Sequence, residues 1–210
     1  DSMFYEFLPL NFESYDEICT IDELEVGKEY EIVTTNLSGF YRYRMKDIIR
    51  VIGKKNETPI VEFLYRLDQC LSLTGEKINE EHLRKAVYTT EEELGFNLID
   101  FSAYADSDSS PMKYVFLLEI ESMPEGLNKD IIKKAINKNF AIAEPLLGYK
   151  LEKGMLDEAE VKFLQAETYL LYKDLRVAKG TSSAQVKPPR ILRDDLTKRF
   201  FLVLLDDELN

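Results

Sequence analysis

The first third of the chain alternates between apolar and polar positions with a period of two, as half-buried β-strands do. Turn residues at Gly27, Ser38-Gly39 and Gly53 separate the apolar runs. We therefore expect a small β-subdomain that ends near residue 67. Its predicted strands span residues 5–8, 29–35, 40–45, 48–52 and 60–65.

From Gly75 onward, helical and strand periods follow one another. Asn79 is a suitable helix N-cap, and the helical apolar face after it stops near Gly95, which predicts a first helix. Apolar positions with lysines between them predict a second helix from about Asn128. The fold class is therefore α+β, with a small β-subdomain followed by a mixed α+β carboxyl-terminal domain. Further strands are predicted at 98–104, 114–121 and 160–164, a helix at 166–177, and a helix or a strand at 196–205.

Composition narrows the class of protein. The 27 basic and 39 acidic residues give a net charge of −12, which argues against nucleic acid as a partner because phosphate binding needs a basic surface. No apolar run reaches the length of a membrane span. Cys19 and Cys70 lack metal-type spacing, so we expect buried, unpaired thiols in a cytoplasmic protein. The sequence does not indicate an oligomeric state.

Three short segments carry the candidate chemistry. They are Tyr41-Arg42-Tyr43-Arg44-Met45-Lys46-Asp47, Glu62-Phe63-Leu64-Tyr65-Arg66-Leu67-Asp68 and Gln185-Val186-Lys187-Pro188-Pro189-Arg190. A carboxylate at a strand end accepts hydrogen bonds from two vicinal ribose hydroxyls well. Asp47 is placed for this role in a predicted turn between two strands, although such a residue is also an ordinary turn former.

In this order, the three segments resemble those of adenylate-forming enzymes, which activate a carboxylate with ATP before passing the acyl group to an acceptor. More narrowly, Phe4–Pro9, Gly39–Asp47 and Gln185–Arg190 together resemble the auxin-responsive promoter (Gretchen Hagen) family of acyl acid-amido synthetases. The resemblance spans nearly the whole chain. It implies the carboxyl-terminal part of a ligase that forms an acyl-AMP from an acyl acid. The ligase then transfers the acyl group to the amine of an amino acid.

The resemblance also implies the cofactors and their sites. ATP and Mg²⁺ are required, but the family's phosphate-binding segment and its magnesium-coordinating acidic motif belong before Asp1, so we expect no metal ligand within this chain and no activity from this chain alone. Asp47 and Arg66 would hold the nucleotide. The alternative for Arg66 is a surface arginine paired with one of the many carboxylates, without a role at the nucleotide. Tyr41 would line the adenine or acyl pocket, or lie in the core. Lys46 stands where the family usually has Gly, which tolerates a positive φ better.

Asp68 resembles the residue about which the carboxyl-terminal domain of related enzymes rotates between the adenylating and the acyl-transfer arrangement. We accordingly predict domains at residues 1–67 and 68–210, with a hinge near Asp68. Residues 71–77, with Gly75 among them, resemble the loop that enters the site in the second arrangement. An ordinary interdomain linker is the alternative.

Lys187 carries the greatest predicted catalytic weight. Adenylation builds negative charge on the α-phosphate, and a lysine delivered by a loop lowers that barrier. Residues 180–183, which lead into the loop, are polar and predicted to be flexible. Pro188-Pro189, directly after Lys187, restrict the backbone there. Arg190 is expected to hold the loop to an acidic neighbour. The alternative for Lys187 is a solvated surface charge.

Two other functions remain open from the sequence. Coenzyme A could replace the amine as acceptor, because the acceptor groove would be shared with the rest of the protein. A non-catalytic α+β module that binds a ligand or a protein is the interpretation from another class. His82 is the single histidine, so no nucleophilic triad or histidine metal site can be assembled around it.

Overall fold

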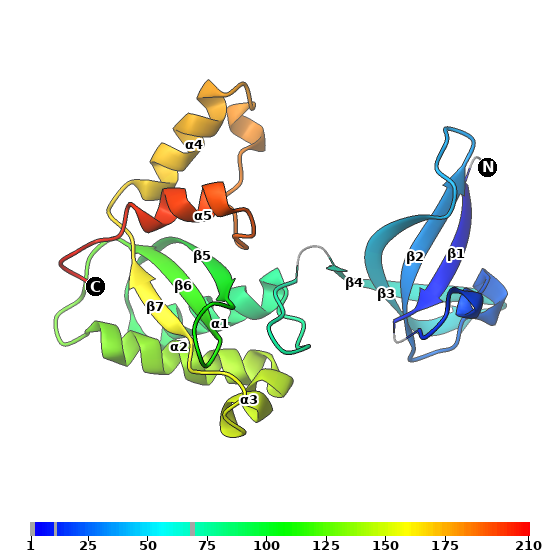
Figure 1. Cartoon of the computed structure of the whole chain (residues 1–210), viewed down its shortest axis with the longest axis horizontal. Coiled ribbons are helices and arrows are strands. Elements are labelled where there is room, and N and C mark those ends of the chain that lie inside the picture. The colour runs from blue at the N-terminus through cyan, green and yellow to red at the C-terminus, as the bar shows by residue number, and fades with distance from the viewer. Residues whose placement is uncertain (1–2, 11, 68–69) are drawn as a thin grey trace. The chain divides into compact units, whose positions relative to one another are not determined.

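The structure is a computed structural model that describes residues 3–10, 12–67 and 70–210. It divides into two compact units, Asp1–Cys70 and Leu71–Asn210, which we call unit 1 and unit 2 (Figure 1). Unit 1 is rich in strands, and unit 2 combines helices with strands. The predicted α+β fold class is confirmed.

Unit 1 is built on an antiparallel sheet in the order β1-β2-β3-β4. The short 3₁₀ helices η1 (Tyr15–Glu17) and η2 (Ile21–Glu23) lie between its first two strands. Apolar residues of the strands form a small core together with Leu24, which follows η2: Phe7, Leu24, Tyr30, Ile49 and Val51. The strands are β1 (Met3–Pro9), β2 (Glu29–Asn36), β3 (Tyr43–Lys55) and β4 (Thr58–Arg66).

One expectation for unit 1 is corrected. The two strands predicted at 40–45 and 48–52 form the single strand β3, so Asp47 lies within a strand and not in a turn between strands. The sequence suggested a break because Lys46-Asp47 interrupts the apolar alternation. In the structure β3 continues through this point with a β-bulge, which shifts the pairing register between β2 and β3.

Unit 2 contains a sheet in the order β5-β6-β7, in which β6 pairs antiparallel with β5 and parallel with β7. The central strand β6 is buried on both faces, as its unbroken apolar run from Tyr114 to Leu118 suggests. Tyr114 and Phe116 enter one core, and Val115 and Leu117 enter the other. The strands are β5 (Leu98–Asp106), β6 (Lys113–Ile120) and β7 (Glu160–Phe163).

Helices cover both faces of this sheet (Figure 1). The first core takes residues from α1 (Glu80–Leu94), α2 (Lys129–Ala143) and α3 (Pro145–Glu152). The second takes residues from α4 (Thr168–Ala178) and α5 (Asp195–Leu202). Unit 2 is therefore a three-layer arrangement with the sheet in the middle.

The N-cap predicted for the first helix and the start predicted for the second are confirmed. The side chain of Asn79 accepts a hydrogen bond from the backbone N–H of His82 at the start of α1, and Gly95 ends that helix with φ of 70°. Asn128 accepts in the same way from Ile131 at the start of α2.

The structure contains the helix α3, which the sequence did not indicate, and it shows which element the ambiguous segment at residues 196–205 contains. Pro145 and Gly148 are typical loop residues in the sequence, yet both lie within α3, and Gly148 faces Ala141 of α2. The ambiguous tail contains the helix α5, because Asp194 caps it by accepting from the backbone N–H of Thr197.

Candidate functional site

A bulge in β3 determines where Asp47 points. Glu31 of β2 is opposite Ile48 while Val33 is opposite Arg44, so one residue of β2 faces residues 45–47 of β3. Lys46 adopts φ of 61° within this bulge, the left-handed conformation that the family's usual glycine would adopt with less strain.

Asp47 and Arg66 lie opposite each other on β3 and β4 and form a two-pronged ion pair. The Nε of Arg66 lies 2.5 Å from Oδ1 of Asp47, and its Nη2 lies 2.9 Å from Oδ2. The Arg66 side chain is 43% exposed and that of Asp47 is 13% exposed. Each carboxylate oxygen keeps lone-pair capacity beyond its bond to Arg66, so the pair can still accept hydroxyl hydrogen bonds.

Tyr41 lies outside the core of unit 1. Its side chain is 80% exposed, just before β3 begins, and the next tyrosine, Tyr43, is exposed as well. The ring of Tyr43 stacks on that of Phe40 with centroids 4.8 Å apart. Of the two alternatives for Tyr41, a core position is excluded within unit 1, and a role at a ligand stays a prediction.

The sequence patterns did not indicate the groups that hold this segment in place. Arg44, directly before the bulge, makes a two-pronged pair with the buried Glu31, and Arg42 makes another with the buried Glu6. The hydrogen bonds to Glu31 raise the pKa of Arg44. Alternating Arg and Glu on neighbouring strands was the available signal, but the strand register was needed to pair them.

Lys187 is exposed in the loop that follows the 3₁₀ helix η4 (Ser183–Gln185). Within the part of the chain that the structure describes, its ammonium group has no hydrogen bond or ion pair. The loop after it is fastened to β5: the backbone N–H of Ala103 donates to the carbonyl of Arg190 at 2.8 Å, and Leu192 donates to Ala103 at 2.9 Å. The lysine is thus solvated on a fixed support.

The expected role of Arg190 is confirmed. Its guanidinium is ion-paired with Asp100, donates to the carbonyl of Phe101 at 2.7 Å, and lies 4.4 Å from the centre of the Phe101 ring. Burial lowers the pKa of Arg190. Arg190 therefore fixes the loop and is not offered to a ligand.

The loop at residues 71–77 is closed by a bridge between Leu71 and Ile78 and is organised around Glu76. The fully buried carboxylate of Glu76 accepts from the backbone N–H of Leu73, from the hydroxyl of Tyr114 and from the ammonium of Lys150, the last at 2.9 Å. Burial alone disfavours the charged carboxylate, but these hydrogen bonds outweigh it and lower the pKa of Glu76 to about 2. The loop is thus preformed and held by unit 2.

The remaining candidates are placed as follows. Asp68 lies outside the described residues. The thiols of Cys19 and Cys70 are half-buried, whereas the sequence analysis expected buried thiols. The imidazole Nδ1 of His82 lies 3.4 Å from a carboxylate oxygen of Glu144.

The described residues contain no group of three or more His, Cys, Asp or Glu suited to a metal ion. None of the helices described is both long and apolar enough to cross a membrane.

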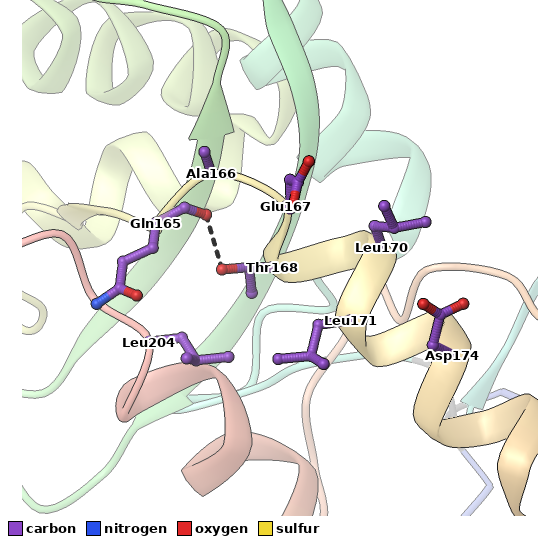
Figure 2. Close-up of a pocket in the computed structure, with 8 residues that line it drawn as sticks. All are labelled: Gln165, Ala166, Glu167, Thr168, Leu170, Leu171, Asp174 and Leu204. Carbon is purple, nitrogen blue, oxygen red and sulfur yellow. Dashed lines mark hydrogen bonds between the residues drawn. The ribbon is translucent and has the colours of Figure 1, made fainter.

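A shallow pocket of about 250 Å³ opens at the start of α4 (Figure 2). The hydroxyl of Thr168 donates to the carbonyl of Gln165 on its wall at 2.7 Å. None of the predicted site residues lines this pocket, so it contributes nothing to the candidate chemistry. Its lining consists of Gln165, Ala166, Glu167, Thr168, Leu170, Leu171, Asp174 and Leu204.

Comparison with known proteins places both units. Residues 1–66 match the GH3 family central domain, and residues 81–195 match the GH3 family C-terminal domain. The 4-substituted benzoates-glutamate ligase GH3.12 of Arabidopsis thaliana is 30% identical over 203 residues, which cover 90% of this chain and 35% of that protein. The probable indole-3-acetic acid-amido synthetase GH3.1 of Oryza sativa subsp. japonica is 29% identical, with coverage of 90% and 33%.

Solved structures agree with this placement. The GH3.15 acyl acid amido synthetase superposes with a TM-score of 0.74 at 25% identity, over 98% of this chain and 37% of that one. A 2-hydroxyisobutyryl-CoA ligase shares the fold, with a TM-score of 0.54 at 12% identity, over 95% of this chain and 37% of that one. The chain spans about a third of the length of the curated relatives it matches. Since the C-terminal domain match alone covers more than half of its residues, the chain belongs to the GH3 family, as its sequence motifs predicted.

Proposed function

We propose that this chain is the carboxyl-terminal part of an adenylate-forming acyl acid-amido synthetase. The longer protein, here called the parent protein, would join an acyl acid to ATP with release of pyrophosphate, giving an acyl-AMP. The amine of an amino acid would then attack the acyl carbon and release AMP, giving an amide. The names of the GH3 relatives, which are amido synthetases and a benzoates-glutamate ligase, support this reaction.

One observation carries the proposal. The same chain holds the Asp47–Arg66 pair in its central-domain segment and the proline-stiffened Lys187 loop in its C-terminal segment. Asp47 offers acceptors suited to ribose hydroxyls, and Lys187 offers a cation suited to the developing charge on the α-phosphate. Neither group serves the core of its own unit.

The roles of the individual residues follow from their chemistry. Asp47 would accept hydrogen bonds from the ribose, and Arg66 would hold the Asp47 carboxylate in place while its exposed edge faces the nucleotide. Tyr41, exposed next to the bulge, would contact the adenine or the acyl group. The metal accompanying ATP would be Mg²⁺, with its ligands outside this chain.

We also propose that the two half-reactions use different arrangements of the protein. Residues 1–67 would end the large adenylating domain, residues 68–210 would form the mobile domain, and Asp68 would be the hinge. The loop at residues 71–77, preformed around Glu76, would enter the site for acyl transfer. We place the parent protein in the cytoplasm.

The test is ATP–pyrophosphate exchange with a panel of aliphatic and aromatic carboxylates, followed by product analysis with amino acids or coenzyme A. The parent protein should catalyse exchange and form amides, whereas the 210-residue chain alone should catalyse no exchange. Robust exchange by this chain alone would contradict the division of the active site. If thioesters formed in place of amides, the parent protein would be a coenzyme A ligase of the same superfamily and not an amido synthetase.

A further inference from the structure

A chain of two buried hydroxyl groups ends at the loop that carries Lys187. The Ser102 hydroxyl on β5 donates to the carbonyl of Pro189 at 2.5 Å, and the Tyr169 hydroxyl on α4 donates to Ser102 at 2.8 Å. Ser102 is fully buried, and Tyr169 nearly so. In such a dry environment each hydrogen bond polarises the next, and loss of either leaves a buried polar group unpaired.

The start of this chain is itself fixed. The backbone N–H of Tyr169 donates to the buried Glu119 of β6 at 2.9 Å, and the same carboxylate accepts from Glu167 at 2.7 Å. The ring of Tyr169 packs against that of Phe201 with centroids 5.1 Å apart. The position of the Tyr169 hydroxyl is therefore determined by β6 and by α5 together.

The prolines transmit this fixed position to Lys187. Each proline ring fixes its own φ, and a residue before proline is restricted to extended conformations. Because Ser102 holds the Pro189 carbonyl and Ala103 holds that of Arg190, the segment from Pro188 to Arg190 forms a rigid stalk on β5. The other end of the loop contains Gly180 at φ of 95° and exposed serines, and it imposes less restriction.

We infer that Ser102 and Tyr169 are positioning residues for Lys187 in adenylate formation. The inference rests on the function proposed above and extends it to two residues that the motifs did not indicate. Neither side chain contacts the reacting atoms. Both limit the orientations open to Lys187, so that fewer conformations are lost when the ammonium meets the α-phosphate.

The test uses Ser102→Ala and Tyr169→Phe in the parent protein, each alone and together with Lys187→Ala. Single-turnover formation of acyl-adenylate should fall about tenfold for Ser102→Ala and about threefold for Tyr169→Phe, the range expected for loss of one or two hydrogen bonds. The KM for ATP should stay unchanged. In the Lys187→Ala background both effects should vanish, because residues that act through one group are not additive.

Tyr104→Phe is the matched control. Tyr104 belongs to the same core cluster and is as buried as Tyr169, but its hydroxyl makes no hydrogen bond to the loop in the described part of the chain. It should leave adenylate formation unchanged. If Ser102→Ala does not fold, Tyr169→Phe carries the comparison alone.

Two results would overturn the inference. If the losses persist undiminished in the Lys187→Ala background, the hydroxyl chain acts on stability or on another group. If Tyr104→Phe slows the reaction as much as Tyr169→Phe, the effect is a general one of the core. A Lys187→Ala protein with normal adenylate formation would instead contradict the proposed role of Lys187, and this inference with it.

Discussion

The Asp47–Arg66 pair of unit 1 and the Glu76–Lys150 pair of unit 2 differ greatly in their exposure to solvent. In unit 1 the Asp47–Arg66 pair presents a guanidinium side chain that is 43% exposed, whereas in unit 2 the Glu76–Lys150 pair has side chains 0% and 9% exposed. Ion pairs that water reaches contribute little to stability, but breaking a buried pair leaves a charge without its partner in the interior. The proposed task of the partly exposed pair in unit 1 is to meet a ligand, whereas the buried carboxylate of Glu76 in unit 2 fixes a loop.

The largest effect should come from breaking the buried pair. Lys150→Met should reduce the free energy of unfolding of unit 2 by about 3–5 kcal/mol, because Glu76 would lose its counter-charge in the interior. Urea unfolding followed by hydrogen exchange of the β6 amides reports on unit 2 directly. Lys138→Met is the matched control, since the Lys138–Glu93 pair is exposed and should contribute less than about 1 kcal/mol. Equal effects would remove the contrast between buried and exposed pairs.

Acid should reveal the same contrast without a mutation. The pKa of Glu76 is depressed to about 2 in the folded chain, so its contribution is fully present above the unfolded pKa near 4.5 and is lost as the pH falls from there toward 2. The loss should approach about 3 kcal/mol, at 1.36 kcal/mol for each unit of pKa difference. Urea midpoints of unit 2 between about pH 6 and pH 2.5 measure it. Glu76→Gln should flatten much of this pH dependence, and an unchanged slope would mean that other carboxylates cause it.

Asp47→Ala in the parent protein tests the exposed pair. Loss of charge-assisted hydrogen bonds to the ribose should weaken ATP binding by about 2–4 kcal/mol, since bonds to charged groups contribute about 1.5–3 kcal/mol each. Calorimetric titration with ATP measures the change. Glu29→Ala removes the similar cross-strand pair of Glu29 with Arg50 and should leave ATP affinity unchanged. Unaltered ATP affinity in Asp47→Ala would leave Asp47 a purely structural partner of Arg66.

Lys187→Ala should slow adenylate formation by about a hundredfold or more, as loss of one preorganised charge-stabilising group does. Transfer from a preformed acyl-adenylate should be nearly unaffected. Single-turnover rates of the two steps give the answer, with Lys179→Ala as the control for an exposed lysine on the same unit.

Asp68→Pro should give the opposite pattern. A fixed φ near the hinge would hinder rotation while leaving the adenylating arrangement accessible, so transfer should slow and adenylation should not. If Lys187→Ala and Asp68→Pro lose both steps equally, the assignment of the two half-reactions to two arrangements is wrong.

The smallest effect is expected at Lys46. A left-handed residue other than glycine is strained by roughly 1–2 kcal/mol, while glycine costs about 0.5–1 kcal/mol of chain entropy. Lys46→Gly should therefore stabilise unit 1 by about 0.5 kcal/mol without changing ATP affinity. Lys54→Gly, in the same strand, should destabilise it. Thermal unfolding of both variants makes the comparison, and destabilisation by Lys46→Gly would show that its side-chain contacts outweigh the strain.

The sequence by itself determined the features that depend on neighbouring residues. The caps at Asn79 and Asn128 and the doubly buried run of β6 follow from local patterns, and the fold class follows from their order. The motifs around Asp47 and Lys187 indicated the family for the same reason, because each is a continuous segment. The proposed division of roles between the two segments therefore rests on local sequence.

Only the tertiary structure decided the features that need residues far apart in the chain. A one-residue change of register moves every side chain to the other face, so the bulge at Lys46 and the pairing of Arg44 with Glu31 do not follow from alternation. Lys150 and Glu76 are typical surface residues by type, and only the fold buries them together. The hydroxyl chain from Tyr169 to Pro189 joins helix, strand and loop, and its partners meet only because the sheet brings β5 between them.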